Sequence, residues 1–178
     1  MNLKLNSFIC MTPLQKTRAI LQQQVFGKAD VNAEIYLMNM PTGSGKTLCS
    51  VKFALERVIR TGKKRIIYII PYNSIIDQTV SVFEEILGSD AEILRHQSTF
   101  SYEENGYTED YRKAVKHAAE NWDVTSIVVT TAVQFFESVY ANKRGKLRKM
   151  HNMADSILIF DEAHLIFCTA VIQYHQRY

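Results

Sequence analysis

One short stretch constrains the fold of this chain more than any other: residues 40–47, with the sequence Met-Pro-Thr-Gly-Ser-Gly-Lys-Thr. An apolar run at residues 35–38 precedes it, and a segment with helical periodicity follows it. Glycines at positions 43 and 45 let successive backbone N–H groups turn inward, and the helix that follows directs its positive end to the same place. The stretch therefore predicts a phosphate-binding loop between a strand and a helix.

Each residue type in this loop would have a role in binding the phosphates of a nucleotide. Lys46 would reach the β- and γ-phosphates, and the hydroxyl of Thr47 would become a ligand of the accompanying Mg²⁺. Met40 stands where the usual pattern has its first glycine, so a glycine-rich turn with a surface lysine is the alternative. The expected nucleotide-binding residues are Pro41, Thr42, Gly43, Ser44, Gly45, Lys46 and Thr47.

A helix is expected to begin near the N-terminus, with Thr12 as its cap, Pro13 at its first position and an apolar stripe at Leu14, Leu21 and Val25. Gln15 then has two possible roles. Its side chain could return to the N–H of Thr12 and close a capping box, or its amide could read the adenine edge of a nucleotide.

Apolar runs and helical stripes alternate along the rest of the chain. Buried strands are predicted at residues 66–70, 127–129 and 157–160, with a shorter one at 91–94. Helices are predicted between them, one of them capped by Ser74, and loops at residues 97–110 and in the basic run 143–149. A contact with a nucleic-acid backbone is the alternative for the basic run. This alternation predicts an α/β fold, a parallel sheet with helices on both faces, and ligands at the carboxyl ends of the strands.

Length and composition favour a single domain, residues 1–178, with a substantial core. The net charge of +3 is too small to indicate nucleic-acid binding, and no apolar run is long enough to span a membrane. The N-terminus lacks the core of a signal peptide, so we expect a cytoplasmic protein. Three widely spaced cysteines indicate neither a disulfide framework nor a zinc site.

A second motif, Asp161-Glu162-Ala163-His164, directly follows the last predicted strand. Asp161 would hold Mg²⁺ directly or through water, and Glu162 would orient or deprotonate the attacking water. Two acids at a helix N-terminus would be the structural alternative, but the phosphate-binding loop in the same sheet favours catalysis.

The two motifs together resemble the first RecA-like, P-loop NTPase domain of a DEAH-box superfamily 2 helicase. This resemblance implies that His164 links the nucleotide site to a nucleic-acid site. Residues 65–78 and 130–137 further resemble the helicase part of the CRISPR-associated type I effector helicase-nuclease, and the likeness covers about residues 12–165. That family implies single-stranded DNA and a guide-RNA effector complex as partners, and a role in antiviral defence.

The resemblance also implies a track for single-stranded DNA along the segments that follow two strands. Ser74 and Thr131 could equally be helix caps, and Pro71 could simply end a strand. The expected DNA-contacting residues are Pro71, Asn73, Ser74, Thr130, Thr131 and Gln134.

The chain departs from the family at its end. Residues 166–178 do not resemble the family, and we expect the second RecA-like domain and the HD nuclease domain to be absent from these 178 residues. By itself the chain is expected to bind Mg-ATP with little or no helicase activity. Another superfamily 2 motor, such as a restriction-system translocase, and a non-catalytic nucleotide-binding fragment are the alternative functions.

Overall fold

The structure, a computed structural model, describes residues 12–88, 91–96, 117–118, 122, 125–140 and 144–165. Its regular elements are, in chain order, α1 (Pro13–Phe26), α2 (Lys46–Thr61), β1 (Arg65–Ile70), a 3₁₀ turn (Asn73–Ile75), α3 (Ile76–Leu87), β2 (Ile93–His96), β3 (Ile127–Thr131), α5 (Ala132–Val139), α6 (Arg144–Met153) and β4 (Ser156–Phe160).

The four strands form one parallel sheet with the order β2-β3-β1-β4. In this register Ile67 of β1 lies between Val128 of β3 and Leu158 of β4. Parallel neighbours that are far apart in sequence require crossover connections, which the helices supply. The predicted α/β architecture is therefore confirmed and is that of a RecA-like domain.

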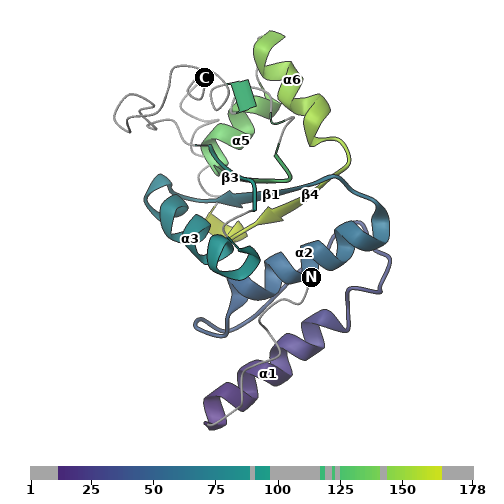
Figure 1. Cartoon of the computed structure of the whole chain (residues 1–178), viewed down its shortest axis with the longest axis vertical. Coiled ribbons are helices and arrows are strands. Elements are labelled where there is room, and N and C mark those ends of the chain that lie inside the picture. The colour runs from purple at the N-terminus through teal and green to yellow at the C-terminus, as the bar shows by residue number, and fades with distance from the viewer. Residues whose placement is uncertain are drawn as a thin grey trace.

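Helices cover both faces of the sheet (Figure 1). On one face Ile66, Tyr68 and Ile70 of β1 pack against α2 and α3. On the other face Ile67 and Ile69 pack with Trp122 and the apolar residues of α5. Because successive side chains of a strand point to opposite faces, the unbroken apolar run of β1 serves both cores at once. All five of these isoleucine and tyrosine residues of β1 are buried.

Helix α1 lies outside these two layers, against α2 (Figure 1). The predicted capping box is present: the N–H of Gln15 donates to Oγ1 of Thr12 at 3.3 Å, and the N–H of Thr12 donates to Oε1 of Gln15 at 3.0 Å. No residue of α1 is fully buried, and Leu14 is 61% exposed, so the predicted apolar stripe is wrong at that position. At the end of the helix, the Lys52 ammonium of α2 lies over the Phe26 ring.

The strand predicted at residues 35–38 is not formed. Ile35 and Leu37 are 88% and 93% exposed, and among the described residues no strand pairs with this segment. Tyr36 instead holds the segment near α2, because its ring packs edge-on against Phe53 and lies under the Arg57 guanidinium. An apolar run becomes a strand only when another strand accepts its backbone hydrogen bonds.

Three further predictions need correction. Helix α3 begins after a 3₁₀ turn, with Ile75 at its cap and no side-chain cap bond, so Ser74 does not cap it. The basic run is not a loop, since helix α6 begins at Arg144. The short strand β2 occupies Ile93–His96, two residues later than predicted.

The loop predicted at residues 97–110 and the tail at 166–178 lie outside the described residues. Within the described ranges, no helix combines the length and the apolar character needed to cross a membrane.

Candidate functional site

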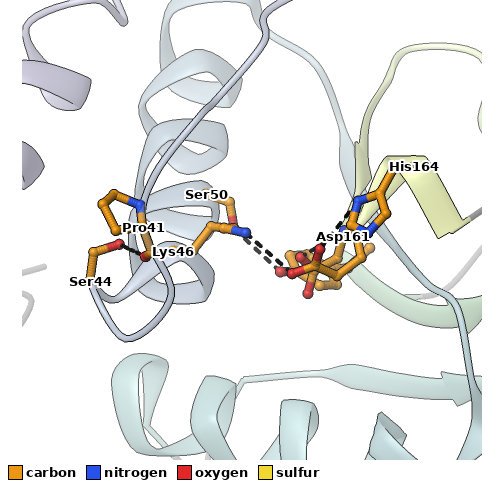
Figure 2. A network of polar contacts seen from close by, with 8 residues as sticks. Pro41, Ser44, Lys46, Ser50, Asp161 and His164 are labelled. Atoms are coloured by element: carbon orange, nitrogen blue, oxygen red, sulfur yellow. Dashed lines mark hydrogen bonds and ion pairs between the residues drawn. The ribbon is translucent and has the colours of Figure 1, made fainter.

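The loop before α2 has the tight backbone that its glycines predicted. Gly43 and Gly45 both have positive φ angles, 76° and 87°, which are costly for any residue with a side chain. The Ser44 hydroxyl and the Ser44 N–H both donate to the carbonyl of Pro41, at 2.6 and 3.2 Å. These bonds fold the loop back on itself directly before the helix, as Figure 2 shows.

Helix α2 starts at Lys46 with Gly45 as its cap, and no side chain caps its N-terminus. The first N–H groups of a helix have no partner within the helix, so they are donors for a ligand, and the helix dipole favours an anion there. The arrangement fits a bound phosphate.

The Lys46 side chain points from the start of α2 toward the residues that follow β4 (Figure 2). Its ammonium donates to Oε1 of Glu162 at 3.2 Å. The other oxygen of Glu162 lies 3.5 Å from Nδ1 of His164. The two predicted motifs are thus joined in a single polar network, Lys46-Glu162-His164.

Asp161 occupies the position directly after β4, and its N–H donates to the carbonyl of Ile69 at 2.8 Å. Its carboxylate accepts the N–H of Glu162 at 3.0 Å. Glu162 has a φ of 49°, in the left-handed region that residues with side chains rarely occupy. The fold therefore holds Glu162 in a strained conformation, a feature that clusters at functional sites.

A third side chain at the site was not predicted from the sequence. Tyr68 of β1 is buried, and its hydroxyl interacts with the side chains of Ser50, Thr47 and Asp161. Burial, and then the negative charge of Asp161, raises the pKa of Tyr68 well above its ordinary value. The phenol therefore stays protonated and can donate to the Asp161 carboxylate.

This donor set fits a hydrated Mg²⁺ ion. Thr47 and Asp161 supply a hydroxyl and a carboxylate oxygen beside the same Tyr68 hydroxyl, and Mg²⁺ prefers oxygen ligands. Mg²⁺ is usually held by one or two protein carboxylates, several waters and the phosphates of a nucleotide.

The residues expected to contact DNA fall on two neighbouring strands. Residue 70 of β1 is in register with Thr131 of β3, so the segments after these strands lie next to each other. Pro71, Asn73 and Gln134 are half-buried, and Ser74 is exposed. These four residues are accessible to a ligand at the carboxyl ends of β1 and β3.

The two threonines differ from this expectation. Thr130 has no exposed surface, and its hydroxyl is hydrogen bonded to Nδ1 of His96 at 2.9 Å, so it is not placed to contact DNA. Thr131 is also buried and accepts the N–H of Gln134 at 3.4 Å, which is the capping role that we considered for it.

Two residues of α1 also lie beside the loop. A Cβ atom added to Gly43 would be 3.8 Å from Nη2 of Arg18, and one added to Gly45 would be 3.1 Å from Nε2 of Gln22. In the sequence, only their spacing of three and seven positions from Gln15 could have pointed to them, because residues so spaced share one side of a helix.

Comparison with known proteins extends this description. A family model described as DEAD/DEAH box helicase matches residues 18–175. The chain is similar to the CRISPR-associated nuclease/helicase Cas3 of Haloferax volcanii, with 34% identity over 72% of this chain. The match spans 16% of the length of that relative.

Proposed function

The chain belongs to the DEAD/DEAH box helicase family, and from this premise we propose that it is the ATP-binding first motor domain of a CRISPR-associated helicase. The juxtaposition of Lys46 with Glu162 carries the proposal. A phosphate-binding lysine and a carboxylate base must face the same phosphoryl group in an ATP-hydrolysing site. Here the two side chains are in contact, although they come from opposite ends of the chain.

The residues have distinct roles in this proposal. The loop residues 41–47 bind the phosphates, with Lys46 at the β- and γ-phosphates and Gln15 at the adenine. Thr47 and Asp161 hold Mg²⁺, which supplies neutralisation of phosphate charge when it is bound. Glu162 accepts a proton from the attacking water, and Tyr68 fixes the Asp161 carboxylate by donating a hydrogen bond.

His164 is the link between the two halves of the function. Its ring lies 3.5 Å from Glu162 and is 72% exposed, so it contacts the nucleotide site on one side and remains accessible on the other. We propose that it transmits the state of the nucleotide to bound single-stranded DNA. Asn73, Ser74 and Gln134 would donate to the phosphates of the strand, and Pro71 would line the same track.

The proposed substrate and partners are based on the similarity to the Haloferax volcanii protein. Its name, CRISPR-associated nuclease/helicase, supports a helicase role within a CRISPR system. On this basis we propose single-stranded DNA as the substrate, recruitment by a guide-RNA effector complex, and a role in antiviral defence in the cytoplasm. Because the match spans 16% of that relative, these roles are proposed for the domain as part of a larger machine.

Binding of Mg-ATP to the 178-residue chain tests the proposal without requiring turnover. A ligand that binds only the folded state raises the melting temperature with its concentration. We expect Mg-ATP to raise the melting temperature of the parent chain, and we expect Lys46→Ala to abolish this increase. Lys63→Ala is the matched control, because Lys63 also forms an exposed ion pair, with Asp155, at a site apart from the loop. A shift that survives in Lys46→Ala would contradict the proposed site.

A further inference from the structure

One side of α1 carries polar residues where a packed helix normally carries apolar ones. Gln15, Arg18 and Gln22 lie at positions i, i+3 and i+7, which share one side of a helix. All three are half-buried, whereas Lys16 and Ile20 elsewhere on the helix are exposed. The polar side of α1 is therefore turned inward.

Distances place this polar side at the phosphate-binding loop. The Arg18 guanidinium and the Gln22 amide lie close to Gly43 and Gly45, at 3.8 and 3.1 Å from the points where side chains of these glycines would begin. Any side chain at position 43 would contact the guanidinium, and one at position 45 would force the Gln22 amide to move. The loop and α1 thus approach each other through two glycines and two polar side chains.

Within the described chain, Arg18 is the charged group of this contact that has no hydrogen-bond or ion-pair partner. Its Nε–H is buried and has no acceptor, and the side chain makes no hydrogen bond or ion pair with the part of the chain that the structure describes. By contrast, Lys46 is paired with Glu162. A guanidinium remains charged at every relevant pH, and a buried N–H without an acceptor is destabilising. An anion at the loop would supply the missing acceptors.

We propose that Arg18 is a further phosphate-binding residue of this site and that it contacts the phosphate chain of a nucleoside di- or triphosphate held by the loop. The inference rests on the proposed function. A guanidinium presents two parallel N–H groups that match two phosphate oxygens, and such charge-assisted bonds are about twice as strong as neutral ones. Helix α1 then forms a second wall of the site, and the Gln22 amide fixes its distance from Gly45.

Inorganic pyrophosphate and Mg-ATP, titrated separately into the 178-residue chain, distinguish this role from base recognition. We expect Arg18→Ala to weaken binding of both ligands by a similar factor, about tenfold or more, because both present the phosphate chain. Arg18→Lys keeps the charge but loses the planar pair of donors, so we expect an intermediate loss. Urea unfolding of each variant checks that the fold is retained.

Lys16→Ala is the matched control, since it removes one positive charge from the exposed part of the same helix. Equal weakening in Lys16→Ala and Arg18→Ala would show a general charge effect and overturn the inference. Parent-like binding in Arg18→Ala, with binding lost in Lys46→Ala, would overturn the inference and leave the proposed function standing. A parent chain that binds neither ligand would overturn both.

Discussion

The Lys46 ammonium lies 3.2 Å from a carboxylate oxygen of Glu162, a residue 116 positions away in the sequence. This ion pair occupies the place where a bound phosphate would meet the lysine. A nucleotide must therefore displace Glu162 from Lys46, or share the lysine with it, when it enters the loop.

We expect Glu162→Gln to bind ATP more tightly than the parent chain does. Half-exposed ion pairs contribute about 0.2–1 kcal/mol, so removing the competing carboxylate should lower the Kd by about 1.4- to fivefold. Calorimetric titration measures this change. Glu84→Gln is the matched control, because it breaks a similar exposed ion pair, with Arg95 at 2.9 Å, away from the loop. An unchanged or higher Kd in Glu162→Gln would show that the pair does not oppose binding.

The two roles of Gln15 can be separated by two substitutions. Gln15→Ala should lower the free energy of unfolding by about 1 kcal/mol, because it removes half of the capping box with Thr12. Gln15→Glu keeps the acceptor for the Thr12 N–H but cannot donate to adenine. If Gln15 reads the base, the parent should prefer ATP to GTP, and Gln15→Glu should lose that preference at nearly unchanged stability. Equal binding of ATP and GTP by the parent would leave only the capping role.

Hydrolysis by the 178-residue chain alone should be very slow. The Lys46 and Glu162 side chains are 32% and 39% exposed, so the site is open to bulk water. An added arginine alone is worth about 10³–10⁵ in rate in related phosphoryl transfers, and a closed cleft would also shield the reaction from water. Steady-state phosphate release should show no stimulation by single-stranded DNA, and strand separation should be absent. Brisk, DNA-stimulated turnover that disappears in Glu162→Gln would contradict this expectation.

Alkaline pH should destabilise the fold through Cys49. Burial raises the pKa of this thiol from 9.0 to about 11, against a smaller opposing effect of the Lys52 charge. Below pH 9 the Cys49 thiol keeps its proton in both the folded and the unfolded state. Between about pH 9 and 11 the thiol loses its proton in the unfolded state but keeps it in the folded state. The free energy of unfolding therefore falls as the pH rises through this range. Urea unfolding across this range should show a shallower decline in Cys49→Ala than in the parent. Parallel curves for the two proteins would contradict the assignment.

Some structural features that depend on residues close together in the sequence were predicted correctly. The capping box of Thr12 and Gln15 and the loop between residues 40 and 47 depend on neighbours in the chain, and both are present. The predicted strand β1 is also present, because its apolar run pairs with β3 and β4. Both motifs were expected at the carboxyl ends of strands in one parallel sheet. Glu162 does lie just beyond β4, but no described strand precedes Lys46, so the contact between the two side chains was not predicted.

Predictions that depended on distant partners succeeded less often. Residues 35–38 have the composition of a strand, but no described strand pairs with them. Thr130 was expected just after a strand, but it lies within β3 and its hydroxyl is hydrogen bonded to His96. No short sequence motif indicated that Arg18, Gln22 and Tyr68 would lie at the site. The packing of α1 and β1 brings them there.

The unpaired edge of strand β4 is expected to affect how the protein behaves in solution. Within the described chain it pairs with β1 alone, and Leu158 and Phe160 are partly exposed. Ile35 and Leu37, elsewhere on the surface, are almost fully exposed. An apolar strand with an unpaired edge is a template for another strand, including that of a second copy. Self-association would then grow with protein concentration and would mimic ligand-induced stabilisation. Titrations repeated at several dilutions, with sedimentation alongside, separate the two effects.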